Sequence, residues 1–163
     1  MPLDATMIKF YYTGGGTAVA SLGGSATANE CGISINSLFG NITSTEAASG
    51  IVKYRAVDAK NEHGGKSITD AALFRSSATT SATTEVWLAF DSVATQSIAN
   101  ELTAPTGLTF YNTAVSRATG IALSTPWTAG TKQRLWLKLV VDAGTSTLAV
   151  DAGELAVIGD RVP

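Results

Sequence analysis

The stretch TEVWLAFD, residues 84–91, carries the clearest structural signal in the chain. Its large aliphatic and aromatic side chains recur at every second position, as Val86, Leu88 and Phe90, while Trp87 falls on the opposite face. A period of two residues is typical of a β-strand with one buried face. We therefore predict a strand over Thr84–Asp91.

Other parts of the chain continue this pattern. Two further strands are expected before it, over Ile51–Lys60 and Ser67–Arg75, joined by a polar corner at 61–66. The stretch Ser76–Thr83 is almost wholly Ser, Thr and Ala, which predicts a hairpin-type connection. A long strand is also expected over Lys132–Asp142, where Leu135, Leu137, Leu139 and Val141 lie on one face and the other face includes Trp136 and charged residues.

These patterns together predict an all-β fold, an antiparallel β-sandwich of jelly-roll or Ig-like type. The two clear apolar stripes are expected to face each other across the sandwich: Val86, Leu88 and Phe90 against Leu135, Leu137 and Leu139. Weaker strand signals lie at Ala5–Tyr12, Gly107–Tyr111 and Thr119–Leu123, and a closing hairpin is expected at Leu148–Asp151 and Leu155–Ile158.

At most one short helix is expected. Thr43 or Ser44 can cap its N-terminus, Glu46 lies in its first turn, and Gly50 can end it.

The first part of the chain differs in composition from the rest. Residues 17–32 are rich in Gly, Ala, Ser and Thr and offer little to bury. Long segments of this kind in compact proteins tend to be functional or ordered by a partner. We therefore predict an N-terminal arm and loop over residues 1–32 and a single sandwich domain over residues 33–163.

Charge is sparse in one region. The chain has 163 residues and a net charge of −2, and only 15% of its residues are charged. From Thr79 to Thr131 the only charged side chains are Glu85, Asp91, Glu101 and Arg117. Such a region is either a Ser/Thr-rich solvated surface or a subunit interface, and composition leaves both open.

Aromatic side chains provide the candidate partner contacts. Large aromatic residues are enriched at the centres of interfaces, although most of them end up in a core. Three adjacent aromatics near the N-terminus and two tryptophans opposite the aliphatic stripes are the candidates: Phe10, Tyr11, Tyr12, Trp87 and Trp136.

No pattern for catalysis or ligand binding emerges. His63 is the one histidine and Cys31 the one cysteine, and neither has an activating neighbour in sequence. The sequence therefore predicts no enzyme activity, no metal and no cofactor. The absence of a Lys/Arg run argues against direct nucleic-acid binding, and no apolar run is long enough for a membrane span.

Two stretches resemble structural proteins of tailed bacteriophages. One is the strand and corner YRAVDAKNEHG at 54–64, followed by the strand at 68–75, and the other is Gly130–Val141 with its Leu-Trp-Leu centre. The aromatic triplet at 10–12 and the pair Leu38-Phe39 are similar as well. The resemblance implies a virion protein of β-sandwich type, made in the host cytoplasm.

Within virion proteins, the small size, low charge and lack of an active-site pattern favour a capsid decoration, or cement, protein. Such a protein would bind the outer surface of the major capsid protein, assemble as a homo-oligomer and stabilise the head. A baseplate or tail accessory protein with a sandwich module, including a sugar-binding one, is the alternative. An enzyme such as a glycan hydrolase is a third class, which would need paired carboxylates on one face.

Overall fold

The computed structural model describes residues 7–77, 82–145 and 153–161. Its elements, in chain order, are β1 (Ile8–Thr13), β2 (Ala26–Cys31), α1 (Asn36–Phe39), α2 (Ser44–Ser49), β3 (Ile51–Asn61), β4 (Ile68–Ser77), β5 (Thr84–Asp91), the 3₁₀ turn η2 (Arg117–Thr119), β6 (Ile121–Ala122), β7 (Lys132–Val141) and β8 (Glu154–Arg161).

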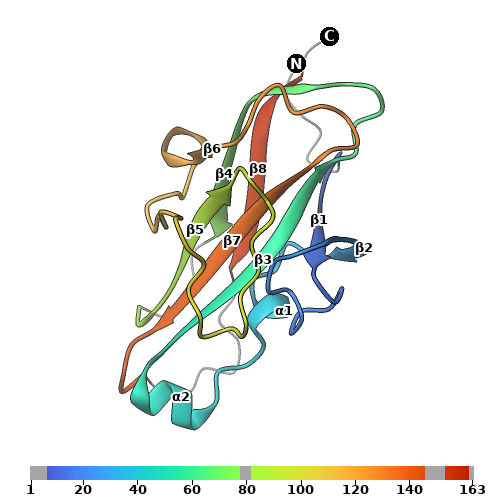
Figure 1. The fold of residues 1–163 in the computed structure, drawn as a ribbon. Coiled ribbons are helices and arrows are strands. Elements are labelled where there is room, and N and C mark those ends of the chain that lie inside the picture. Colours follow the sequence, from blue (N-terminus) through green and yellow to red (C-terminus); the bar gives the residue numbers. More distant parts are fainter. Residues whose placement is uncertain (1–6, 78–81, 146–152, 162–163) are drawn as a thin grey trace.

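Two antiparallel sheets form a β-sandwich, as the sequence predicts (Figure 1). The larger sheet has the strand order β2-β1-β3-β7-β5, and the smaller sheet has the order β6-β4-β8. The all-β prediction is confirmed, although the described residues contain two short α-helices where at most one is expected.

The two aliphatic stripes lie in the same sheet. Strands β5 and β7 are hydrogen-bonded neighbours, with Val86 opposite Leu139 and Leu88 opposite Leu137. The prediction that these side chains are buried together is confirmed for these four and for Leu135, while Phe90 is only partly buried. The prediction that they face each other across the sandwich is wrong, because the opposite layer of the core comes from β4 and β8, through Leu73, Leu155 and Val157.

The predicted hairpins are also corrected. The segment after β4 cannot close a hairpin with β5, because β4 belongs to the small sheet and β5 to the large one. Likewise β8 pairs with β4, and the expected strand at Leu148–Asp151 falls outside the described residues. The expected strand at Thr119–Leu123 shrinks to β6, and Gly107–Tyr111 contributes only an isolated bridge between Tyr111 and Leu88.

The segment predicted as an arm is part of the large sheet. Strand β1 lies between β2 and β3, pairing with β3 from Ile8 opposite Asn61 to Tyr12 opposite Val57. Ile8 and Phe10 belong to the main core. The division into an arm over residues 1–32 and a separate domain is therefore corrected for the described residues, because strand pairing and core burial join β1 and β2 to the sandwich.

The predicted helix is α2. Thr43 is its N-cap, and its hydroxyl accepts a hydrogen bond from the Glu46 amide at 3.2 Å while the Glu46 carboxylate accepts from the Thr43 amide at 2.9 Å. This reciprocal pair is a capping box, which satisfies two amides that the helix itself cannot. Gly50 ends the helix at a φ of 75°, a conformation that glycine adopts without a steric cost.

The large sheet is covered on both faces. Its inner face packs against the small sheet. On its outer face Ala56, Ala89 and Trp136 form a second apolar cluster with Ile98. In Figure 1 the yellow segment that follows β5 crosses in front of β7 and β3, and this segment supplies Ile98, Leu108 and Phe110 to the second cluster. Over this cluster the outer surface is therefore made by loops and not by the sheet.

Candidate partner-binding surface

Most of the five aromatic side chains predicted as partner contacts are buried within the chain. Phe10 and Trp136 are 3% and 0% exposed, and Tyr11 is 8% exposed. Tyr12 is partly buried and packs against the main core. The prediction of a partner contact is corrected for Phe10, Tyr11 and Trp136, because neighbouring elements of the same chain already cover their rings.

Tyr11 is held by charged neighbours on the outer side of β1. Its hydroxyl donates to the Glu62 carboxylate at 2.5 Å, and the Lys132 ammonium lies 4.3 Å from the centre of its ring. The hydrogen bond to Glu62, followed by burial, raises the pKa of Tyr11 to about 12. The ring therefore links β1, the polar corner after β3 and β7 within the chain, which accounts for its burial without a partner.

Trp136 is covered by the loops over the large sheet. Its indole nitrogen donates to Asp91 Oδ2 at 3.2 Å. Asp91 also accepts hydrogen bonds from the amides of Val93 and Ala94. Burial alone would raise the pKa of Asp91, but these hydrogen bonds outweigh it and lower that pKa. The carboxylate thus fixes the start of the covering loop directly over the tryptophan.

Trp87 is the predicted contact residue that keeps a partly exposed ring on the outer face of the large sheet. Its indole nitrogen donates to Glu85 at 2.8 Å, and the Lys138 ammonium lies 4.3 Å from the ring centre. Asn112 approaches the same Glu85 carboxylate at 3.4 Å. Trp87 therefore remains accessible at the edge strand β5, beside the segment that follows Tyr111.

A buried ion pair fixes the outer face of the sheet beneath the loops. Arg134 on β7 donates through Nε to Asp58 Oδ1 on β3 at 2.5 Å, and the two side chains are 1% and 2% exposed. Arg134 also donates through Nη2 to the carbonyl of Gly24 at 2.8 Å. The pair therefore ties two central strands to the loop between β1 and β2.

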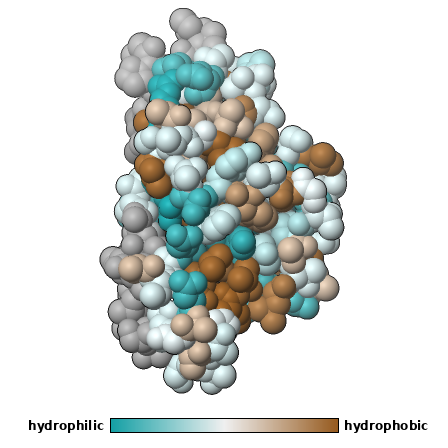
Figure 2. Space-filling model, turned by 90° about the vertical axis from the view of Figure 1, so that its left-hand side faces the viewer, coloured by the Kyte–Doolittle hydropathy of each residue, from teal (hydrophilic) through white to brown (hydrophobic). Residues whose placement is uncertain are grey.

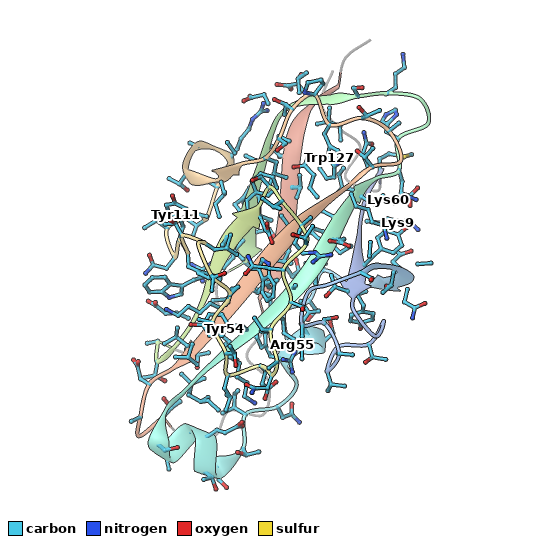
Figure 3. The ribbon with its side chains drawn as sticks, in the orientation of Figure 1. Lys9, Tyr54, Arg55, Lys60, Tyr111 and Trp127 are labelled. Atoms are coloured by element: carbon cyan, nitrogen blue, oxygen red, sulfur yellow. The ribbon has the colours of Figure 1, made fainter. Side chains whose placement is uncertain are left out.

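A second charged cluster fixes the long loop at the free edge of β3. The Tyr54 amide donates to the carbonyl of Glu101 at 2.7 Å, so the loop continues the sheet past the end of β1. The Glu101 carboxylate pairs with two buried cations, Arg55 and Lys53, and Lys53 also pairs with Glu46 of α2 at 2.6 Å. Figure 3 shows Tyr54 and Arg55 in this lower part of the large sheet.

A third group of ion pairs joins Arg117 to the small sheet. Its guanidinium pairs with Asp70 and with Asp160, each at 2.6 Å. The hydrogen bonds from Arg117 hold the pKa of Asp160 below its ordinary value. This exposed arrangement places η2 beside β4 and β8.

The four charges of the sparse region are thus engaged inside the chain. Asp91 binds Trp136, Glu101 pairs with Lys53 and Arg55, Arg117 pairs with Asp70 and Asp160, and Glu85 accepts from Trp87. The segment 92–120, which we call the 92–120 connection, therefore presents few charges to solvent. Four large hydrophobic side chains of this connection are exposed to solvent, with exposed fractions of 71% for Val93, 59% for Leu102, 52% for Val115 and 46% for Tyr111.

Sequence reasoning locates this charge-poor region but does not identify these four exposed residues. Figure 2 shows the side of the molecule that carries β5, β6 and Tyr111, where brown hydrophobic patches lie among white residues and teal hydrophilic ones. Isolated exposed hydrophobic residues are ordinary, and a contiguous apolar patch is what marks an interaction surface, so these four residues are candidates for a partner contact. No sequence signal distinguishes these four from Ile98, Leu108 or Phe110, which lie in the same connection and turn inward.

The residues considered for chemistry lie apart from this surface. Cys31 is buried beside Phe10 in the β1–β2 pairing, and burial raises the pKa of its thiol to about 12, which leaves little thiolate at neutral pH. His63 lies in the polar corner after β3. Within the described residues, no three His, Cys, Asp or Glu side chains are grouped to hold a metal ion, and no helix is long and apolar enough to cross a membrane.

A scan against protein-family models finds no match for this chain, and searches of curated proteins and of solved structures find none either.

Proposed function

We propose that this protein is a decoration protein of a tailed-phage capsid, which binds the outer surface of the major capsid protein as a homo-oligomer and stabilises the head. One observation carries the proposal: both charged side chains of the 92–120 connection are held in ion pairs within the chain, while four of its large apolar side chains are exposed, namely Val93, Leu102, Tyr111 and Val115. The resemblance of the strand and corner at 54–64 and of Gly130–Val141 to phage virion proteins supplies the class of partner.

The mechanism follows from the cost of removing water. Charged groups resist burial against a partner, whereas Ser, Thr, Ala and aliphatic groups lose little when they are desolvated. A specific interface covers about 800 Å² on each partner, and the 92–120 connection spans the outer face of the large sheet and its β5 edge. Buried area of this kind between neighbouring subunits adds stability to a shell without any chemical step.

The scaffold suits a mechanical role because the connection is held at several points. The Asp91 hydrogen bonds fix its beginning, the Glu101 ion pairs fix its middle, and the backbone pairing of Tyr111 with Leu88 follows. A surface that is already ordered loses less conformational entropy when a partner binds. The exposed side chains are therefore presented on a rigid base.

The test is binding to capsid shells that lack the protein, measured by co-sedimentation. The double variant Leu102→Asp, Val115→Asp places two charges on the proposed surface, and we expect at least about a tenfold loss of affinity, or about 1.4 kcal/mol. The control is Val19→Asp, since Val19 is 75% exposed and lies outside the connection. Unchanged thermal unfolding must accompany both variants.

Shell binding that is equal in the double variant and the wild type would refute the proposed surface. Binding of the wild type to purified tails or baseplates, with none to shells, would replace the capsid assignment with the alternative of a tail accessory protein.

A further inference from the structure

The part of the 92–120 connection that covers the outer apolar cluster is separate from the main core. We call residues 95–110 the lid, which is part of the yellow segment that crosses in front of β7 and β3 in Figure 1. Of residues 92–113, all of which the structure describes, none belongs to the main core cluster. The lid instead packs Ile98, Leu108 and Phe110 against the cluster around Trp136. Displacement of the lid would therefore leave the core between the two sheets packed.

The lid lies between two fixed ends. Before it, Asp91 accepts hydrogen bonds from the amides of Val93 and Ala94. After it, the backbone of Tyr111 pairs with Leu88 at the edge of β5. Because both ends are held to the large sheet, the lid can leave the outer face as one unit without releasing the segments that flank it.

Backbone hydrogen bonds also join the lid itself to the covered face. The Gly24 amide donates to the Gln96 carbonyl at 2.9 Å, and the Ile98 amide donates to the Leu22 carbonyl at 2.9 Å. The Tyr54 amide of β3 donates to the Glu101 carbonyl at 2.7 Å. The amides of Tyr54 and Ile98 are therefore protected from water by the lid, and they report whether it is closed.

Glu101 attaches the lid to β3 through buried charge. Its carboxylate pairs with Lys53 at 3.4 Å and with Arg55. The side chains of these two cations are 7% and 4% exposed, so both charges are almost wholly removed from water. Among the described residues Arg55 has no other carboxylate partner, and Lys53 has one other, Glu46 of α2. The lid thus supplies a negative charge that β3 requires.

The other charged groups near the lid do not replace Glu101. The loop between β1 and β2, residues 14–25, contains no charged residue. On the covered face Asp58 is paired with Arg134, and the Lys138 ammonium lies over an indole ring at the β5 edge. In α2 the charged residue is Glu46, which already pairs with Lys53. Loss of the Glu101 charge would therefore leave Arg55 buried and unpaired.

Both polar attachments of the lid depend on carboxylates, which take up protons as the pH falls through about 4. Asp91 accepts from Gln96 Nε2 at 3.3 Å at the start of the lid, and Glu101 holds its middle. Burial alone would raise the pKa of Asp91 and of Glu46, but hydrogen bonds outweigh it and hold these pKa values below the ordinary 3.8 and 4.5. The stabilisation from these two groups is therefore complete above pH 4.5 and is lost as the pH falls through the lowered values.

We propose that the lid is an acid-sensitive device with Glu101 as its clasp: loss of the Glu101 charge releases residues 95–110 from the large sheet while the sandwich stays folded. A buried cation left without its partner supplies the driving force. Opening exposes the apolar cluster around Trp136 and displaces Leu102, one of the four exposed residues of the proposed partner surface. The inference does not rest on the proposed function, because the lid and its clasp are the same whether or not the protein binds capsids.

The first experiment is amide hydrogen exchange of the full chain at pH 7, followed by NMR, in the wild type and in Glu101→Gln. This substitution removes the charge and keeps the shape of the side chain. We expect the amides of Tyr54 and Ile98 to exchange at least about tenfold faster in the variant, while the amide of Leu137 in β7 keeps its protection. The matched control is Glu30→Gln, which makes the same change in the exposed pair with Lys9 and should alter none of these rates.

The second experiment is an acid titration of the indole N–H signals between pH 7 and pH 3. The Trp136 indole donates to Asp91 under the lid, whereas the Trp127 indole donates to the Thr131 carbonyl away from it. We expect the Trp136 proton to begin exchanging with water below about pH 4.5, while the Trp127 signal stays unchanged. In Glu101→Gln the same change should already be present at pH 7, where Asp91 is still ionised.

Three outcomes would overturn the proposal. If Tyr54 and Ile98 exchange in Glu101→Gln as slowly as in the wild type, Glu101 is not the clasp. If these amides and Leu137 lose protection together, the substitution destabilises the whole sandwich and no separate lid exists. If Trp136 and Trp127 change together on acidification, or neither changes down to pH 3, the lid is not acid-sensitive.

Discussion

Removal of Asp58 is the sharpest test of how the large sheet is held together. In Asp58→Ala the guanidinium of Arg134 stays buried but loses the carboxylate that accepts from both Nε and Nη2. Breaking a buried ion pair from one side typically lowers the free energy of unfolding by about 3–5 kcal/mol. The carbonyl of Gly24 still accepts from Nη2, so we expect the lower part of that range, about 3 kcal/mol.

Urea unfolding measures this change. With a slope of about 1–3 kcal/mol per molar urea, the midpoint should fall by about 1–3 M. The control is Glu30→Ala, which breaks the exposed pair with Lys9, whose side chains are 42% and 51% exposed. Exposed pairs contribute about 0–1 kcal/mol, so this midpoint should hardly move.

A double variant separates the charge from the packing. Asp58→Leu with Arg134→Met removes both ions and keeps apolar volume at the site, and we expect it to be more stable than Asp58→Ala, because no buried charge is left unpaired. A loss below about 1 kcal/mol in Asp58→Ala would show that the pair is not desolvated, and the pair could then not be what fixes the outer face of the sheet.

The remaining predictions concern the core, the N-terminal strands and the unused thiol. Leu137→Ala, at a site 0% exposed, should lower the free energy of unfolding by about 2–5 kcal/mol, and a loss below about 1 kcal/mol would contradict its place in the core. A chain that begins at Ile33 should fail to unfold cooperatively in circular dichroism, because it lacks β1 and β2. The double variant His63→Ala, Cys31→Ser should bind shells like the wild type, and a complete loss by a folded protein would contradict the non-enzymatic proposal. The pKa of Cys31 is raised from its ordinary 9.0 to about 12, so its contribution to stability is complete below pH 9 and is lost as the pH rises toward 12; Cys31→Ser should reduce this alkaline loss in a pH series of thermal melts.

The elements with strong local signals can be predicted from the sequence. Strand β5 has the predicted bounds, and the residues of its capping box locate α2, because both depend on neighbours close in the chain. Strand β2 is not predicted from the sequence, because its residues, ATANEC, show almost no alternation of apolar and polar side chains. It forms a strand by backbone pairing with β1, and side chains do not reveal such pairing.

Sheet membership cannot be predicted from the same pattern. An apolar stripe shows which face of a strand is buried, but two neighbouring strands of one sheet and two facing strands of different sheets produce the same stripe. Which of the two arrangements forms depends on the pairing of strands that are far apart in the sequence. In this chain that pairing makes Leu137 the cross-strand neighbour of Leu88 in the same sheet, and the small sheet supplies the opposite layer of the core.

The sequence predicts partner contacts on the strands of the large sheet, which loops in fact cover, and Trp136 shows why. A tryptophan opposite an aliphatic stripe is exposed if the sheet has one covered face, and buried if loops cover the second face. In this protein two segments far apart in the sequence meet over the ring, where the Gly24 amide donates to the Gln96 carbonyl at 2.9 Å. Gly23 permits this approach, because a Cβ there would lie 2.8 Å from Trp136 Cζ2. The proposed partner surface is therefore not the sheet itself but the 92–120 connection that covers it.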